Sequence, residues 1–233
     1  AQISLLSTAQ IGGLASTAVA ALAVTQLDAM GATAIAALSA SGIAGLTGTQ
    51  LASLDATQMA ALTTAQVAAL STTALSGLTA SNIGALTTTQ LGSLSAQGMA
   101  ALATEAIATL SSTQVASLPA TAIGGMTSTQ VATLSTSQMA ALTAAQISAL
   151  SGTGIEGLTT QQIDALTATQ VAALSTAGVA GLTASQVAAL DTIQLAALPQ
   201  TLIAALSATA IPGLGETQLQ SLSASQFQGL TTT

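Results

Sequence analysis

The chain of 233 residues contains no Lys, Arg, His, Cys, Trp or Tyr, and its one aromatic residue is Phe227. Nucleic-acid binding depends on cationic side chains that neutralise phosphates, so the missing Lys and Arg argue against a nucleic-acid partner. Anionic membrane surfaces are disfavoured for the same reason. Without His or Cys the usual zinc sites cannot form, and no disulfide can stabilise the fold.

Apolar runs long enough to span a membrane are also missing, because Ser, Thr or Gln interrupts the sequence every few residues. The first six residues, Ala-Gln-Ile-Ser-Leu-Leu, contain no basic segment ahead of an apolar one, so no signal peptide is predicted there. Large aliphatic residues nevertheless recur along the whole chain. They supply the core material that disordered segments lack.

What the sequence does contain is a tandem repeat of eight residues. Residues 7–230 divide into 28 octads without an insertion or deletion, a partial octad precedes them, and Thr231-Thr232-Thr233 begin another. We number the octad so that position 8 is Leu, or Met in two octads; residues 63–70, Thr-Thr-Ala-Gln-Val-Ala-Ala-Leu, are a typical unit. Residues 1–233 are therefore expected to form a single repeat domain.

The residue types tolerated at each position assign the faces of the octad. Position 5 is always Ile, Val, Leu, Met or Phe, so positions 5 and 8 are predicted to form the core. Position 7 is only Ala, Gly, Ser or Thr, which indicates that another stretch of backbone passes close to it. Position 6 admits Asp28, Glu156 and Asp164, so it is predicted to face water.

A period of eight residues does not fit a long regular element. In a continuous α-helix the apolar pair would drift by about 80° per octad and form no stripe. In a strand, positions 5 and 8 would point to opposite faces of the sheet. The pattern therefore favours a short element that restarts in every octad.

Two sequence signals indicate that a new helix begins in each octad: a capping box and a hydrophobic staple. Ser or Thr at position 1 and Gln at position 4 form an S/T-x-x-Q capping box in twelve octads, and Asp55 with Gln58 and Asp191 with Gln194 add two in which Asp is the cap. The Leu before the cap and the aliphatic residue at position 5 are the two partners of a hydrophobic staple.

The predicted fold is a repeat solenoid, mainly α, with one helix from position 2 to position 7 of each octad and a turn at positions 8 and 1. Pro119 and Pro199 fall at the cap position, whereas Pro212 falls at position 6, where it removes an α-type hydrogen bond and predicts a tighter turn. A β-solenoid is the alternative, because Thr at positions 1 and 3 alternates with Ile at position 5 as in a short strand.

A longer period is superimposed on the octad. Small residues replace Gln at position 4 in Gly42, Gly98, Gly154 and Ala210, which are 56 residues apart. Seven octads are therefore expected to make a whole number of superhelical turns, with two turns as the natural choice.

No catalytic, cofactor-binding or metal-binding residue is predicted. The carboxylates are isolated, no Asp-x-Asp-x-Asp calcium loop occurs, and no Ser or Thr has a His or Lys to act as its base. The expected role of the carboxylates is to solubilise the surface, although Glu156 and Asp164 share position 6 in adjacent octads and could meet on one face. The seven carboxylates are Asp28, Asp55, Glu105, Glu156, Asp164, Asp191 and Glu216.

Two columns of polar side chains remain as candidate binding surfaces. The Gln column could present a ladder of amides to a partner, but local helix capping explains it more simply. The Ser and Thr columns could bind ice or carry sugars, against the simpler explanation of caps on a neutral solvated surface. The Met residues at position 5, such as Met59, are expected to fill gaps in the core.

The run Leu-Thr-Thr-Ala-Gln-Val-Ala-Ala-Leu at residues 62–70 resembles the tandem repeats of very long bacterial surface and adhesin-like proteins, and the resemblance extends over essentially the whole chain. It implies secretion, display on the cell surface and a role as spacer, filament or adhesin. The low charge of this chain departs from that pattern.

The expected function is accordingly structural. The chain is predicted to be an extracellular or cell-surface protein, not an enzyme, that forms a rod, filament, stalk or sheath by association with itself. The alternative is a repetitive binding face for ice, a glycan or another surface. No cofactor is expected.

Overall fold

The computed structural model describes residues 3–230, so residues 1–2 of the first partial octad and all of the last partial octad, residues 231–233, lie outside the described residues. The chain forms two compact units, Ala1–Ala122 and Ile123–Thr233. The boundary falls inside α15 (Ala120–Gly124), where the phase of the octads does not change. That all octads belong to one solenoid stays a prediction.

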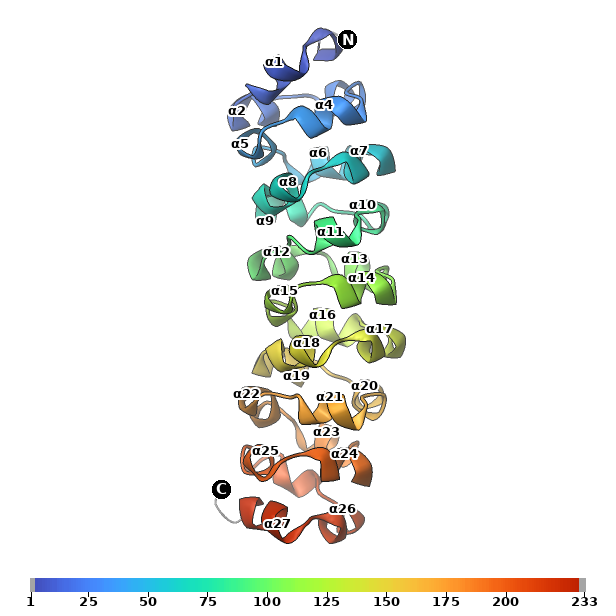
Figure 1. The fold of residues 1–233 in the computed structure, drawn as a ribbon, viewed down its shortest axis with the longest axis vertical. Coiled ribbons are helices and arrows are strands. Elements are labelled where there is room, and N and C mark those ends of the chain that lie inside the picture. The colour runs from blue at the N-terminus through green and yellow to red at the C-terminus, as the bar shows by residue number, and fades with distance from the viewer. Residues whose placement is uncertain (1–2, 231–233) are drawn as a thin grey trace. The chain divides into compact units, whose positions relative to one another are not determined.

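The described residues form 27 short α-helices and two 3-10 helices, and no strand (Figure 1). The helical repeat solenoid is thus confirmed, and the β-solenoid alternative is not supported. Unit 1 contains η1 (Ile3–Leu5), α1 (Thr8–Gly12), α2 (Ser16–Ala20), α3 (Val24–Asp28), α4 (Ala32–Ala37), α5 (Ala40–Ile43), α6 (Gly48–Ser53), α7 (Ala56–Ala61), α8 (Thr64–Ala69), α9 (Thr72–Leu75), α10 (Ala80–Ala85), α11 (Thr88–Leu91), α12 (Ala96–Ala101), α13 (Thr104–Ala108) and α14 (Ser112–Ser117).

Beyond α15, the helices of unit 2 continue in the same rhythm of one per octad. They are α16 (Ser128–Thr133), α17 (Thr136–Ala141), α18 (Ala144–Ala149), α19 (Gly152–Glu156), α20 (Thr160–Asp164), α21 (Ala168–Ala172), α22 (Thr176–Ala180), α23 (Ala184–Ala188), α24 (Thr192–Ala197), α25 (Gln200–Ile203), η2 (Ile211–Gly213), α26 (Glu216–Ser221) and α27 (Ala224–Leu230). No helix within residues 3–230 combines the length and apolar character needed to cross a membrane.

Each described α-helix begins at position 2 of its octad, as predicted, but only some reach position 7; others, such as α1 (Thr8–Gly12) and α9 (Thr72–Leu75), end one or two residues earlier. In α8 (Thr64–Ala69) the helix runs from position 2 to position 7, and the N-cap Thr63 has extended backbone angles, φ −75° and ψ 158°. At the other end Leu70 leaves the helix with φ −60° and ψ 133°, so the chain turns without a left-handed residue. A helix this short is unstable alone, so its stability must come from neighbouring octads.

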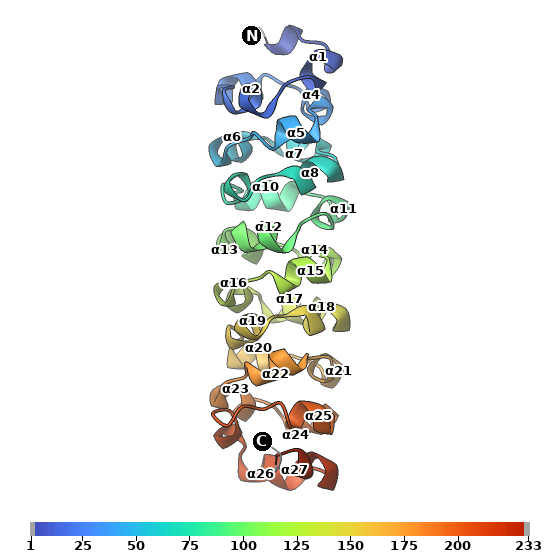
Figure 2. The same ribbon diagram turned by 90° about the vertical axis from the view of Figure 1, so that its left-hand side faces the viewer.

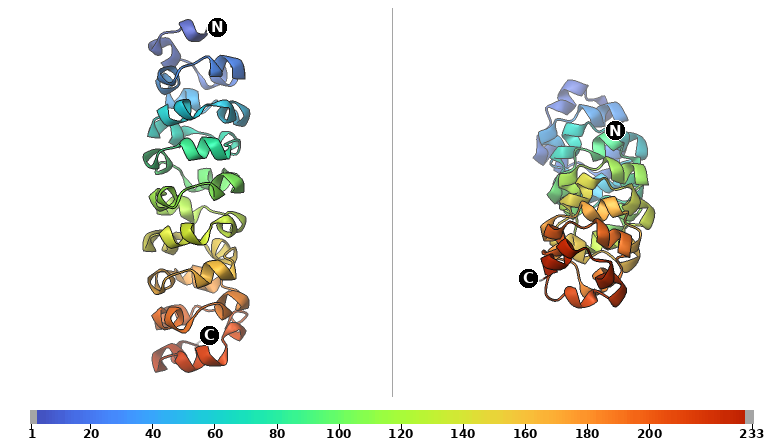
Figure 3. Two further views of the ribbon diagram at one scale, coloured as in Figure 1. Left: turned by 90° about the vertical axis from the view of Figure 1, so that its right-hand side faces the viewer. Right: turned by 60° about the horizontal axis from the view of Figure 1, so that its bottom comes forward.

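Successive coils bring together helices that are three octads apart. In unit 1, α4 packs on α7, and α7 packs on α10; these helices follow one another on the right of Figure 1. In unit 2, α19 packs on α22 and α22 on α25, and Figure 2 shows the same order of helices from a second side. The two further views in Figure 3 show short helices joined by short turns within each unit.

The core contains the positions that the pattern predicts. In the octad of residues 63–70, Val67 at position 5 is 1% exposed and Leu70 at position 8 is 7% exposed, whereas the cap and the next two residues are exposed. Met59 at position 5 of the preceding octad is fully buried, as expected of a gap-filling residue. Position 6 is exposed at Asp28, Glu156 and Asp164, which confirms its solvent-facing assignment.

The backbone also approaches position 7 closely, as predicted. A Cβ atom added to Gly45 would lie 2.0 Å from the Ser16 carbonyl oxygen, and one added to Gly157 would lie 2.2 Å from the Ser128 carbonyl oxygen. In each pair the second residue stands at position 2 of the octad three before. No described glycine has a positive φ, so these residues are needed for lack of a side chain and not for a special backbone angle.

The proline positions behave differently from one another, as the sequence predicts. Pro199 is the N-cap of α25, where no intrahelical donor is lost. Pro212 at position 6 replaces the N–H that donates to position 2 in other octads, for example from Ser76 to the Thr72 carbonyl. Its octad forms only the 3-10 helix η2 (Ile211–Gly213), which is the tighter turn expected there.

Candidate functional site

The most distinctive polar feature of the structure is the column of Gln side chains at position 4. Gln66 illustrates its local role, because its Oε1 atom accepts a hydrogen bond of 2.7 Å from the backbone N–H of Thr63. In return, the Gln66 N–H donates to the Thr63 hydroxyl at 3.2 Å. Both halves of the capping box are therefore present, and the capping interpretation of the Gln column is confirmed.

The Nε2 atom of the same side chain has a second role that the sequence did not predict. Gln66 Nε2 donates to the carbonyl oxygen of Ile35 at 2.9 Å and to that of Leu38 at 2.7 Å. These carbonyls belong to positions 5 and 8 of the octad four before, on the neighbouring coil. One amide thus caps its own helix and ties two coils together.

This inter-coil tie repeats in both units with the same sequence separations of 31 and 28 residues. Asn82, whose side chain is one methylene shorter, keeps only the bond to the Leu54 carbonyl, at 2.8 Å. The side chains that bond to both carbonyls include those of Gln50, Gln58, Gln66, Gln90, Gln162, Gln170, Gln186, Gln194, Gln218 and Gln226.

The helix packing and the Gln hydrogen bonds together limit the number of octads in one turn of the solenoid. Helices pack against helices three octads away, and Gln amides reach carbonyls four octads away. One turn therefore takes between three and four octads, that is, between about 24 and 32 residues. Two turns of 28 residues would account for the 56-residue period in the sequence.

The tied Gln side chains are not exposed to a partner. Gln66 is 2% exposed, and no buried side-chain nitrogen or oxygen in residues 3–230 lacks a hydrogen-bond partner. Buried amides that are already bonded have no free group to offer a ligand. A ladder of Gln amides for a partner is therefore not what these side chains form.

Octads with Gly in place of Gln form a different, small-residue site at position 4. The N–H of Gly42 donates to the Ser39 hydroxyl at 3.0 Å, so the cap is retained. A Cβ on Gly42 would lie 2.8 Å from the Leu14 carbonyl oxygen, and one on Gly98 would lie 3.1 Å from Leu75 Cδ1. Neighbouring coils thus fill the space that a Gln side chain would need.

The carboxylates are dispersed, as the sequence predicts. Asp55 and Asp191 are N-caps that accept from the N–H groups of Gln58 at 2.8 Å and Gln194 at 2.6 Å. Within residues 3–230 no group of three His, Cys, Asp or Glu side chains could hold a metal ion.

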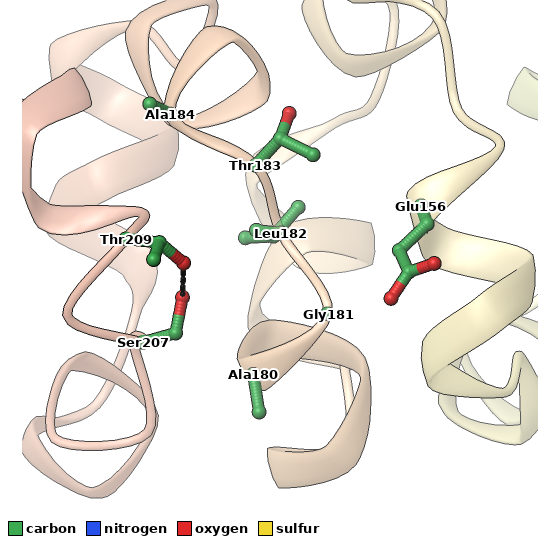
Figure 4. Close-up of a pocket in the computed structure, with 8 residues that line it drawn as sticks. All are labelled: Glu156, Ala180, Gly181, Leu182, Thr183, Ala184, Ser207 and Thr209. Carbon is green, nitrogen blue, oxygen red and sulfur yellow. Dashed lines mark hydrogen bonds between the residues drawn. The ribbon is translucent and has the colours of Figure 1, made fainter.

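One shallow cavity of about 370 Å³ lies in unit 2, among octads that are distant in sequence. Glu156 lies on one side of it and Ser207 and Thr209 on the other, with residues 180–184 between them (Figure 4). The hydroxyls of Ser207 and Thr209 are 3.0 Å apart and share a hydrogen bond. A carboxylate and hydroxyls suit a ligand rich in hydroxyl or amino groups, and the sequence missed this grouping because only the coiling brings it together.

The comparisons with known proteins concern the repeat and not the cavity. Residues 59–96 and 144–176 match the family model of the ALTTAQ repeat. Both stretches are similar to this repeat. Residues 61–66, Ala-Leu-Thr-Thr-Ala-Gln, spell its name and contain the cap of α8 together with the amide that ties the coils. The chain has no match among curated proteins.

Proposed function

We propose that this chain is a structural repeat protein that forms a filament, stalk or sheath outside the cell by association with itself. The observation that carries the proposal is the inter-coil tie, as in Gln66 with Ile35 and Leu38. The same contact recurs with the same separations along both units, so the octads that carry the tied Gln present equivalent surfaces to the octads four before them. A stack built from equivalent nearest-neighbour contacts can be extended at low cost.

The composition supports a mechanical role in preference to a chemical one. The buried polar groups are used internally, and the exposed Ser and Thr side chains have no His or Lys in the chain to act as a base. An extracellular or cell-surface location rests on the resemblance to bacterial surface proteins and on the absence of Cys. Fractionation of the source cells, with antibody labelling of intact cells, tests it; label confined to lysed cells would contradict it.

Self-association is tested with the purified 233-residue chain. Sedimentation velocity over a hundredfold range of protein concentration should show species that grow with concentration, and electron microscopy should show elongated assemblies or a surface layer. A single monomeric species at every concentration, with only dispersed particles in the micrographs, would refute assembly.

A repetitive or local binding face is the second candidate, and the cavity beside Glu156 favours it specifically. A glycan array that includes amino sugars provides the probe. Binding that falls in the Glu156→Gln variant but not in Asp164→Asn, which alters an exposed carboxylate one octad away, would support the cavity as the site. Equal binding by both variants and the unmodified chain, or none by any, would reject it.

A further inference from the structure

The cavity beside Glu156 lies next to the place of a missing Gln. Ala210 stands at position 4 of an octad whose positions 1 and 3 line the cavity. The fully tied Gln side chains reach carbonyls 31 and 28 residues earlier, so a Gln at position 210 would reach those of Val179 and Leu182. Residues 180–184 also line the cavity, and they include Leu182. The cavity and the spacing of the ties thus point independently to the same stretch of backbone.

The backbone groups that a Gln would bind remain without an amide at this place. The N–H of Ala210 still donates to the Ser207 hydroxyl at 3.2 Å, so the octad keeps its cap. In tied octads the N–H of position 1 donates to the Gln Oε1 atom, as Asp191 does to Gln194 at 2.8 Å. Within residues 3–230, the N–H of Ser207 has no such acceptor and the carbonyl oxygen of Leu182 has no such donor. One donor and one acceptor are therefore left beside the cavity.

Ala210 differs in this respect from the glycines at position 4. At Gly42 and Gly98, an atom of a neighbouring coil lies within 3.1 Å of an added Cβ, so the structure closes over the place of the amide. The octad of Ala210 instead borders a cavity of about 370 Å³. Pockets for small ligands span about 300–1,000 Å³, so this volume lies at the lower end of their range.

The rim of the cavity adds groups that suit the hydroxyls of a sugar. Glu156 is exposed on one side, and its carboxylate accepts hydrogen bonds (Figure 4). Thr183 and Thr209 are also exposed, and their hydroxyls can donate or accept. A ligand that satisfies the whole site presents an amide to the backbone and hydroxyls to the rim. An N-acetylated amino sugar carries both.

We propose that the cavity binds the acetamido group of an N-acetylated amino sugar in the place of the missing Gln amide. The acetamido oxygen accepts from the Ser207 N–H, the acetamido N–H donates to the Leu182 carbonyl oxygen, and hydroxyls of the sugar donate to Glu156. This inference rests on the second candidate function above, binding at the cavity, and names the chemical group that is recognised.

Three disaccharides with the same β-1,4-linked glucose skeleton test which group is recognised. They carry acetamido, free amino or hydroxyl groups at carbon 2 of each ring. Titration of the 233-residue chain, followed by NMR, should give a dissociation constant for the acetamido compound that is at least about tenfold lower than for the other two. Equal or tighter binding of the free amino compound would mean that Glu156 recognises charge. The acetamido inference would then be wrong, while binding at the cavity would stand.

Ala210→Gln places an amide of the chain itself in the site. It should weaken binding of the acetamido disaccharide by at least about tenfold and raise the urea midpoint of unfolding, because the new amide completes a tie. Ala145→Gln is the matched control, since it adds the same side chain at an exposed position 3 of unit 2 and should change neither quantity. Ala210→Leu introduces a residue that position 4 already accepts at Leu202, and it should also weaken binding, so the test does not depend on the folding of one variant.

The possible failures are distinguishable. If the acetamido disaccharide binds equally well to the unmodified chain, Ala210→Gln and Ala210→Leu, it does not occupy the place of the missing amide and the inference is wrong. If all three disaccharides bind the unmodified chain with equal affinity, the acetamido group is not recognised and the inference is likewise wrong. If none of them binds at millimolar concentration, both this inference and sugar binding at the cavity are overturned, whereas the proposed self-association is unaffected.

Discussion

At the scale of single residues, the Gln at position 4 supplies hydrogen bonds that stabilise both its own short helix and the contact between coils. It closes the capping box through Oε1 and ties the preceding coil through Nε2, as in Gln66 with Thr63 on one side and Ile35 and Leu38 on the other. An amide suits this position because it offers an acceptor and two donors in one plane. A carboxylate offers only acceptors.

Gln66→Glu should therefore destabilise the fold by about 3–5 kcal/mol at neutral pH, since a buried carboxylate would face two carbonyl oxygens. The loss should shrink on acidification, because a protonated carboxyl group can donate one hydrogen bond. Urea denaturation followed by circular dichroism measures both effects. Gln10→Glu is the matched control: Gln10 is exposed and only its cap is used, so a change within about 0.5 kcal/mol is expected. Equal losses in the two variants would show that the inter-coil bonds contribute nothing.

Glycine at position 7 is the second residue with an identifiable role. Gly77→Ala should destabilise by about 1–3 kcal/mol, because its Cβ would lie 2.4 Å from Gly48 Cα and backbone would have to move. Gly84→Ala, at position 6 of the next octad, has nothing within 4 Å of its added Cβ and should stabilise the helix by about 0.5–1 kcal/mol. Thermal denaturation of the two variants should shift in opposite directions, and shifts of the same sign would contradict the close approach at position 7.

At the scale of the helix, the cap defines where each element begins, at position 2 of its octad, and no described α-helix continues past position 8. Pro212 is the informative exception, because its missing N–H leaves only η2 (Ile211–Gly213) in that octad. Pro212→Ala should restore an α-helix and stabilise the chain by about 1–2 kcal/mol.

Hydrogen exchange at the backbone N–H that Pro212→Ala introduces, read by NMR, should then show protection comparable to that of Ser76, which donates to Thr72 at the equivalent place. The control Pro199→Ala alters a cap residue that has no donor to lose, so its stability should change by less than about 1 kcal/mol. Rapid exchange at the introduced N–H would mean that something other than the proline prevents the helix.

The helices could be predicted from the sequence because their signals are local. Thr63 and Gln66 stand three residues apart, and the cap they form depends only on that spacing. The tie from Gln66 to Ile35 could not be predicted, since it spans 31 residues and depends on how many octads make a turn. In the sequence, only the 56-residue spacing of residues such as Gly42 and Gly98 indicated how many octads make a turn. The cavity beside Glu156 was missed for the same reason, because its residues come from octads 19, 22, 23 and 26.

At the scale of the whole molecule, the equivalence of the octads is the property that matters. Deletion of one complete octad, residues 63–70, keeps every remaining octad in phase with those three and four before it. The variant should remain helical and unfold cooperatively, with a midpoint lowered by about 2–4 °C for each kcal/mol lost with the octad.

Deletion of four residues, 63–66, is the contrasting variant. It removes less of the chain but shifts the following octads by half a repeat against those before, so ties that cross the deletion, such as that from Gln90 to Leu62, lose their register. Calorimetry should show a larger fall in the unfolding midpoint for the four-residue deletion than for the eight-residue deletion. A larger fall for the eight-residue deletion would show that the register between octads does not contribute to stability.

The central claim, that the Gln amides hold coil to coil, is tested most directly by hydrogen exchange of the side-chain amides in a chain labelled with ¹⁵N at Gln. The structure predicts two classes: tied amides such as Gln66, which exchange at least about a hundredfold more slowly than exposed ones such as Gln10 and Gln161. A single class in which every Gln side chain exchanges at the rate of the exposed amides would contradict the claim.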